Sequence, residues 1–286
     1  MEQKQYPTID MNAHSGGSLR FLYENAFGRL FLKLLISPFV SKLGGVYLSS
    51  PLSRPMIASF IKKNQIDMHQ YEKGPFASFN DFFKRKMADG VRPSYEDPGL
   101  LLAPCDGKLS AYPITEDCCF SIKGFCYSIH DLLLDEGLAS SFLGGICLVF
   151  RLMPDDYHRY HYIDDGEILS YRKIPGVLHT VRPIALNKFN VFGQNTREYA
   201  LIKTAHMGHM VQMEVGALFV GRISNHKRSG IVKRGEEKGT FEFGGSTVVM
   251  LFEKNSVIVD PILFQNTAED KESIVKMGEP IGSYSS

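Results

Sequence analysis

The chain has 286 residues, of which 44% are hydrophobic and 22% charged, a composition typical of a globular protein with a sizeable core. Lysine and arginine total 32 against 31 aspartates and glutamates, so the formal charge of +1 gives no overall electrostatic reason to expect nucleic-acid binding. The five cysteines lack paired Cys-x-x-Cys spacing, which argues against a disulfide framework or a zinc knuckle and favours a reducing compartment.

Residues 1–17 are polar and end in Gly16-Gly17, so we expect them to form a flexible tail. They lack the basic start and apolar core of a secretory signal. No later window approaches the roughly 18 uninterrupted apolar residues of a membrane-spanning helix, so we expect none.

An amphipathic helix is predicted from Leu19 to Leu35, because apolar residues recur there at three- and four-residue spacing until Pro38 ends the pattern. Between residues 18 and 65, seven lysines and arginines stand against one acid, Glu24, an asymmetry that the balanced overall charge hides. Such a basic helix, rich in phenylalanine and leucine, suits docking on an anionic bilayer surface. Its apolar stripe is equally suited to packing on the protein's own core, and the pattern alone leaves both open.

Further helical pieces are predicted at residues 50–66 and 79–88, and prolines between Pro93 and Pro98 break the chain. From about Leu101 onward the pattern becomes strand-like, with short segments rich in β-branched and aromatic residues. The predicted strands are 146–152, 168–174, 199–204, 210–215, 217–223 and 247–253. One helix, His130–Phe142, is expected to interrupt them.

Turn-length polar segments join most of these strands, without a helix after each one, which favours antiparallel sheets over a parallel α/β sheet. The expected fold class is therefore α+β. A helical N-terminal region is followed by a mainly antiparallel β catalytic core.

The stretch Gly244-Gly245-Ser246-Thr247 joins two short apolar runs, and taken alone it is a plain turn between strands. Upstream lie Asp106, within Pro104-Cys105-Asp106-Gly107, and both His158 and His161, within Asp156-Tyr157-His158-Arg159-Tyr160-His161. An acid, a histidine and a serine are the parts of an activated hydroxyl nucleophile. Taken singly, Asp106 is a common turn residue, and each histidine is equally well explained as a partly buried side chain bonded to backbone carbonyls.

His158 and His161 are three residues apart, a spacing that on a helix would suit a metal ion. However, the segment follows Pro154 and has the pattern of a loop after a strand, and no cysteine supplies an obvious third ligand. We therefore expect no metal site.

Taken together, the separated motifs resemble the phosphatidylserine decarboxylases, specifically bacterial-type proenzymes whose processing motif is Gly-Gly-Ser-Thr where many relatives have Leu-Gly-Ser-Thr. The resemblance covers nearly the whole chain from about residue 18. Besides the Asp106 and histidine segments, it includes Ser78-Phe79-Asn80-Asp81-Phe82-Phe83 and Glu214-Val215-Gly216-Ala217. Cys105 and Gly244 are the visible variations, and neither removes a required functional group.

The resemblance implies that the backbone is the first substrate. Ser246 would attack the carbonyl of Gly245 in an N-to-O acyl shift, with His161 accepting the hydroxyl proton and Asp106 orienting His161. Elimination from the ester and hydrolysis of the resulting dehydroalanine would release ammonia and leave a covalent pyruvoyl group in place of Ser246. Cleavage between Gly245 and Ser246 would give a large β chain (1–245) and a small α chain (246–286), held together as a heterodimer.

The pyruvoyl group derived from Ser246 would then be the cofactor. It would form a Schiff base with the amine of phosphatidylserine and withdraw the electrons released as carbon dioxide leaves, giving phosphatidylethanolamine. His158 is expected to protonate the Cα carbanion, with His161 as the alternative. The chain would thus be the zymogen of a carboxy-lyase of phospholipid biosynthesis.

The implied substrate also favours membrane contact, because a phospholipid headgroup lies at the bilayer surface. We expect residues 18–95 to form a helical, membrane-associating region and residues 96–286 to form the β-rich catalytic core. The expected location is peripheral, on the cytoplasmic face of the cell membrane, with no nucleic-acid partner.

Two other hypotheses remain at this stage. The first is an Asp/His/Ser hydrolase acting on a lipid or ester, which is weakened by the absence of a Gly-x-Ser-x-Gly elbow around Ser246. The second is a non-enzymatic, peripheral membrane-binding β protein whose Gly-Gly-Ser segment is only a turn.

Overall fold

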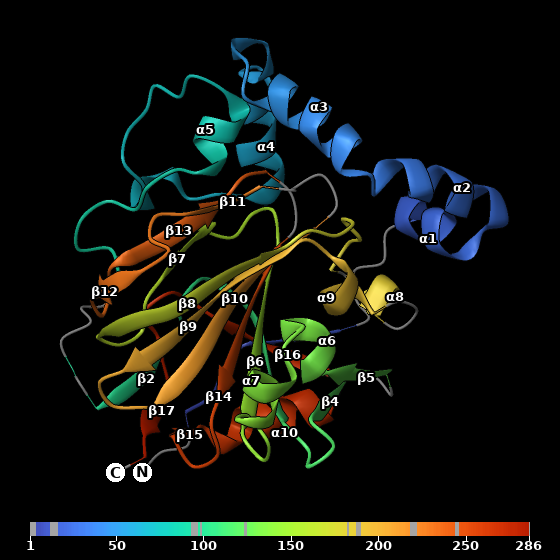
Figure 1. Cartoon of the computed structure of the whole chain (residues 1–286). Helices are drawn as coiled ribbons and strands as arrows, with labels where there is room; N and C mark the ends of the chain where they lie inside the picture. The colour runs from blue at the N-terminus through green and yellow to red at the C-terminus, as the bar shows by residue number, and fades with distance from the viewer. Residues whose placement is uncertain are drawn as a thin grey trace.

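The computed structural model describes residues 4–11, 17–92, 97, 99–122, 125–181, 183–186, 190–217, 222–243 and 246–285. Within these ranges the chain forms N-terminal helices followed by a large antiparallel sheet with smaller sheets and helices packed against it (Figure 1). The predicted α+β fold class is therefore confirmed. Most of the break predicted between Pro93 and Pro98 lies outside the described residues.

The large sheet has nine strands in the order β1-β16-β3-β6-β14-β10-β9-β8-β12, and each pair of neighbours is antiparallel. Their bounds are β1 (Thr8–Asp10), β3 (Gly107–Pro113), β6 (Ile146–Leu152), β8 (Gly166–Ile174), β9 (Arg197–Thr204), β10 (His209–Gly216), β12 (Gly230–Val232), β14 (Ser246–Phe252) and β16 (Lys271–Val275). β14 occupies the middle of this order and is buried along its whole length. Because β6 and β10 pair with all seven of its residues, β14 has no open edge.

One face of the large sheet packs against two three-stranded sheets. The first has the order β11 (Ile223–Asn225), β13 (Glu237–Phe241), β7 (Arg159–His161), and the second has the order β15 (Val257–Val259), β17 (Pro280–Tyr284), β2 (Leu100–Leu102). Alternate residues of β14, Val248 and Met250, join Tyr160 and Phe241 in one apolar core there. Helix α10 (Pro261–Ala268) contributes Leu263 to the same core.

The opposite face of the large sheet is covered by short helices and a hairpin. These are α6 (Ile129–Leu133), α7 (Glu136–Ser140), α8 (Pro183–Leu186), α9 (Val191–Gln194), β4 (Cys119–Ile122) and β5 (Phe125–Ser128). Val249 and Leu251 of β14 point to this side, into a second core that also contains Tyr127 and Phe192. The strict alternation along β14 therefore divides its side chains between two cores.

The N-terminal region is helical. Its elements are α1 (Gly17–Glu24), α2 (Ala26–Leu35), α3 (Pro38–Leu48), η1 (Pro51–Ser53), α4 (Met56–Asn64), η2 (Met68–Gln70) and α5 (Phe79–Phe83). Figure 1 shows α1 and α2 at one side of the molecule, beyond the end of α3. α4 lies within the predicted 50–66 piece, whereas α5 is shorter than the predicted 79–88 helix.

Two further predicted helices differ from the structure. The single helix expected from Leu19 to Leu35 is broken at Asn25, whose Oδ1 accepts a 2.9 Å bond from the Phe27 amide and starts a new helix. The expected His130–Phe142 helix is likewise divided, because Leu134 is left-handed with φ 51° and Asp135 caps α7.

The strand predicted at 217–223 falls largely on residues 218–221, which lie outside the described residues. The strand of the structure, β11, begins at Ile223 and belongs to the small sheet. In the segment 1–17, predicted to be a flexible tail, residues Thr8–Asp10 form β1 and pair with β16. Residues 1–3 and 12–16 of that segment lie outside the described part.

Candidate active site

Ser246 is the first residue of β14 and is completely buried. It pairs with Leu152 at the end of β6 and with Gly216 at the end of β10. Its Oγ has no hydrogen-bond partner among the described residues, which is uncommon for a buried hydroxyl. Gly244 and Gly245, the other half of the predicted cleavage site, lie outside the described residues.

The segment that leads to the two glycines is anchored at Phe243. Its backbone N–H donates to Asn80 Oδ1 at 3.1 Å. Its ring packs edge-on against Phe79 and Phe83 of α5, at centroid distances of 4.9 and 5.1 Å. The Phe79-Asn80-Asp81-Phe82-Phe83 motif therefore holds the connection between β13 and β14 from its N-terminal side, while the β14 ladder holds it from the other.

His158 lies directly before β7, and its carbonyl accepts from the Phe241 amide at 2.9 Å. Its Nδ1 lies 2.9 Å from the Asp156 carbonyl, which can only accept, so Nδ1 carries the proton. Nε2 is then an unprotonated acceptor, and it has no hydrogen-bond partner among the described residues. Complete burial lowers the pKa of His158 to about 3, so the ring is neutral at pH 7.

His161 ends β7, and its backbone N–H donates to the Pro104 carbonyl at 2.9 Å. Burial lowers the pKa of its imidazole to about 4, although the nearby Glu237 carboxylate opposes the shift. At neutral pH the ring is therefore uncharged and able to accept a proton.

Asp106 is buried and its carboxylate is bonded to three donors. Oδ1 accepts from the Met277 amide at 2.9 Å, while Oδ2 accepts from Arg92 at 2.9 Å and from Lys276 at 3.2 Å. Arg92 and Lys276 were not singled out from the sequence. The ion pair with Lys276 spans 170 residues, and a contact that distant leaves no local pattern.

The strand register brings Asp106 and Ser246 to one end of the large sheet, whereas His158 precedes β7 of a small sheet and His161 ends it. Gly107 begins β3, Leu152 ends β6, Ser246 begins β14 and Gly216 ends β10, and these termini lie in one row across four neighbouring strands. Asp106 directly precedes this row. The bond between His161 and Pro104 holds the end of β7 against the same segment.

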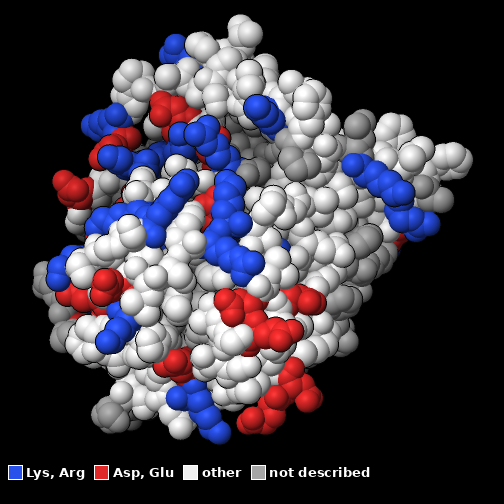
Figure 2. Space-filling view, viewed as in Figure 1, with Lys and Arg blue, Asp and Glu red and all other residues white. Residues whose placement is uncertain are grey.

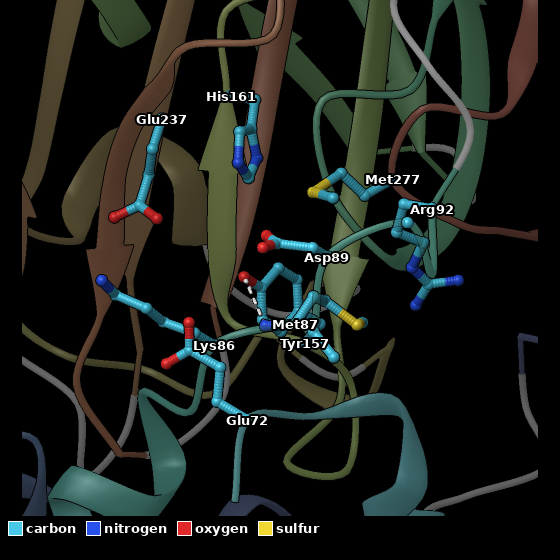
Figure 3. A pocket seen from close by; sticks show the side chains of 11 residues that line it. Glu72, Lys86, Met87, Asp89, Arg92, Tyr157, His161, Glu237 and Met277 are labelled. Carbon is cyan, nitrogen blue, oxygen red and sulfur yellow. Dashed lines mark hydrogen bonds between the residues drawn. The ribbon is translucent and has the colours of Figure 1, made fainter.

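A cavity of about 420 Å³ opens beside His161. Its lining consists of Glu72, Lys86, Met87, Ala88, Asp89, Gly90, Arg92, Tyr157, His161, Glu237 and Met277. Figure 3 shows His161 and Glu237 on one side of the cavity and Arg92 and Met277 on another. Because the wall carries both acids and cations, it suits a polar group that bears both charges.

Within the described part of the chain, no group of three or more histidine, cysteine or carboxylate side chains is arranged to hold a metal ion. Among the same residues, no helix combines the length and the apolar character needed to cross a bilayer.

Ser246, whose buried hydroxyl has no hydrogen-bond partner among the described residues, and the neutral imidazoles of His158 and His161 are the parts of an enzyme that activates a hydroxyl group. The chain belongs to the phosphatidylserine decarboxylase family, because the sequence model described as "Phosphatidylserine decarboxylase" matches residues 79–283. Members of this family are made as proenzymes of pyruvoyl-dependent lyases.

Three curated relatives illustrate the similarity. "Phosphatidylserine decarboxylase proenzyme 2" of Clostridium acetobutylicum is 44% identical over 271 residues, covering 94% of this chain and 92% of the relative. A "Phosphatidylserine decarboxylase proenzyme" of Fusobacterium nucleatum is 40% identical, covering 93% and 91%. One of Ruminiclostridium cellulolyticum is 41% identical, covering 98% and 95%.

Proposed function

We propose that this chain cleaves itself between Gly245 and Ser246 and then converts phosphatidylserine to phosphatidylethanolamine and carbon dioxide. The observation that supports this most directly is that the buried Ser246 hydroxyl has no hydrogen-bond partner among the described residues. Ser246 begins the central strand β14, and the chain belongs to the phosphatidylserine decarboxylase family. A hydroxyl that no described group engages is available to donate its proton to a general base.

In the cleavage step, Ser246 Oγ attacks the carbonyl carbon of Gly245. The new C–O bond replaces the C–N bond, the Oγ proton passes to His161, and the freed nitrogen of residue 246 takes up a proton. Loss of the Cα proton then expels the Gly245 carboxylate and leaves dehydroalanine, which water converts to a pyruvoyl group with release of ammonia. His161 suits the role of base, because its lowered pKa keeps it unprotonated at neutral pH.

Asp106 is proposed to support His161 through the backbone. The carbonyl of Pro104, two residues earlier, accepts the His161 amide, and Arg92 and Lys276 fix the carboxylate that follows. Displacing Asp106 would therefore displace the segment on which the end of β7 rests.

The pyruvoyl group fits position 246, because the residue there is fixed by backbone pairing to β6 and β10 and its side-chain site offers no competing hydrogen bond among the described residues. There it supplies an electron-withdrawing carbonyl for decarboxylation of an amine substrate. His158 is our proposed proton carrier. Its unprotonated Nε2 takes a proton from the ammonium of the substrate and returns it to the substrate carbon after carbon dioxide leaves.

Intact-mass spectrometry of the purified protein tests the proposal. The wild-type chain should give two fragments, residues 1–245 and residues 246–286, the smaller one with a ketone in place of its N-terminal amine. Ser246→Ala should remain one uncleaved chain. Thr247→Val is the matched control, because Thr247 Oγ1 is also buried without a described partner but its side chain points to the opposite face of β14. An active enzyme with an intact chain would refute self-cleavage and favour the hydrolase hypothesis.

We further propose that the helical region 18–95 attaches the catalytic core 96–286 to the cytoplasmic face of the membrane. Leu32 of α2 is buried against the core, whereas Phe27, Leu30 and Phe31 are 77%, 68% and 59% exposed. Figure 2 shows an isolated blue group in the area of α1 and α2. The exposed cations of these two helices are Arg20, Arg29 and Lys33. Exposed apolar side chains beside cations suit an anionic lipid surface.

Flotation with anionic liposomes tests this attachment. The triple substitution Phe27→Ser, Leu30→Ser and Phe31→Ser should reduce co-flotation, since it removes exposed apolar groups without touching Leu32. Substituting the exposed Leu169 and Ile231 of the large sheet by serine is the control and should leave flotation unchanged. Equal flotation of the triple variant and the wild-type protein would contradict the proposed surface.

A further inference from the structure

A buried ion pair joins the small sheet that carries His161 to the large sheet that carries Ser246. Lys238 of β13 and Glu214 of β10 are both completely buried, and Lys238 Nζ lies 2.6 Å from Glu214 Oε1 and 2.5 Å from Oε2. Neither residue has a part in the chemistry proposed above. Two ions inside an apolar core gain little stability over well-packed apolar side chains of similar size, so the pair calls for another explanation.

The hydrogen bonds of this ion pair continue to β7. Asn225 of β11 donates from Nδ2 to Glu214 Oε2 at 3.0 Å, and its Oδ1 accepts from the Tyr160 hydroxyl at 3.0 Å. Tyr160 is completely buried and directly precedes His161 in β7. All three strands of the small sheet therefore contribute one polar group to the contact with β10.

A second connection reaches His161 itself. Gln212 of β10 is completely buried, and its Nε2 donates to the His161 carbonyl at 3.3 Å. The backbone carbonyl of Gln212 lies 3.4 Å from Lys238 Nζ. The His161 carbonyl is thus bonded directly to Gln212 of β10. The Tyr160 hydroxyl is connected to Glu214 of β10 through the side chain of Asn225.

The strand β10 in turn fixes Ser246. Gly216 pairs with Ser246 and Glu214 pairs with Val248, so Glu214 and Ser246 project from the same face of the large sheet on adjacent strands. The bonds from β7 therefore end two residue pairs away from the proposed nucleophile, on the same face of the sheet. Because hydrogen bonds depend on direction, they fix the position of β7 relative to β10 more closely than apolar contacts would.

We propose that five polar residues, here called the β7–β10 polar cluster, position His161 relative to Ser246 for self-cleavage. The cluster consists of Tyr160, Gln212, Glu214, Asn225 and Lys238. They are positioning residues, because their described contacts hold the backbone of β7 and β10. The inference rests on the proposed self-cleavage. A base displaced by a fraction of an ångström from its hydroxyl loses much of its effect, whereas the fold, held by two apolar cores, loses little.

Two nearly isosteric substitutions test the proposal in the full-length chain. Among the described residues, Tyr160→Phe removes only the bond to Asn225, and Gln212→Met removes only the side-chain bond to His161. Each should slow conversion of the intact chain to its two fragments by about 10-fold to 100-fold. Tyr162→Phe is the matched control, because the Tyr162 hydroxyl is buried without a partner among the described residues, and it should cleave at the wild-type rate.

Two further measurements separate positioning from loss of fold. Thermal unfolding of each substitution in a Ser246→Ala background, where every chain stays intact, should show nearly unchanged midpoints. The pH–rate profile of cleavage should also change. If β7 loosens, His161 becomes more hydrated and its pKa rises toward its ordinary value, which moves the acid limb of the profile to higher pH.

The outcomes are distinguishable. Wild-type cleavage rates for both Tyr160→Phe and Gln212→Met would overturn the positioning role and leave self-cleavage standing. Slower cleavage that merely follows a loss of folded protein, with an unmoved acid limb, would overturn it as well. Failure of the wild-type chain to cleave at all would refute the proposed function instead.

Discussion

Lowering the pH from 7 to 5 is expected to destabilise the uncleaved chain through His158 and His161. Burial places the pKa of these rings at about 3 and about 4 in the folded chain, against 6.5 for an ordinary histidine. Because each folded value lies below the unfolded one, the unfolded state binds more protons at acidic pH. The stabilisation is complete above the unfolded pKa and is lost as the pH falls toward the folded values.

The size of the effect follows from the same pKa values. Between pH 7 and pH 5, each histidine lowers the free energy of unfolding by about 2 kcal/mol, and the two together by about 4 kcal/mol. Such a loss is a large fraction of the stability of a typical domain. Removing one of the two rings should therefore remove half of this acid sensitivity.

Urea unfolding of the Ser246→Ala chain, at pH 7 and at pH 5, measures the loss. Adding His161→Gln should reduce the difference between the two pH values by about 2 kcal/mol, because glutamine does not titrate. His69→Gln is the control, since His69 is exposed. An equal loss with and without His161 would refute the burial argument for this residue.

Three other outcomes are expected. Phe243→Ala should slow self-cleavage by at least about tenfold, because it removes the aromatic anchor on α5, and fragment bands on a denaturing gel measure the rate. Lys276→Met should slow it by about tenfold through the lost bond to Asp106, whereas Lys271→Met, which removes only an exposed ion pair with Glu269, should not. The cleaved fragments should co-elute on gel filtration and separate only in denaturant, because the small fragment contains β14, β16 and β17, each paired with a strand of the large one.

Local patterns in the sequence predicted the central strands well. The predicted strand 146–152 has the bounds of β6, and 247–253 is shifted by one residue from β14. Each contains a run of five apolar residues, 146–150 and 248–252, whose side chains are divided between the two cores. The helices were less well predicted, because single polar side chains at Asn25 and Asp135 end one helical segment and cap the next, while the apolar periodicity continues across the break.

The candidate site, too, could be predicted only in part from the sequence. Motifs in the sequence named Asp106, His158, His161 and Ser246, and the structure places Asp106 and Ser246 at one end of the large sheet, with His161 held to the same segment. The partners of these residues could not be named in advance. Bonds such as that between Lys276 and Asp106 depend on strand order, which local patterns do not contain.

The position of the proposed cleavage site explains how this protein could cut its own backbone and keep its fold. β14 is held by β6 on one side and β10 on the other, beginning at Ser246 itself, so breaking the preceding peptide bond frees no strand. The polypeptide before the cut stays anchored through Phe243 on α5. The proposed new terminus at residue 246 would therefore stay beside the row of strand ends at which Asp106 lies. A cofactor made from residue 246, as proposed, would be formed where it is used.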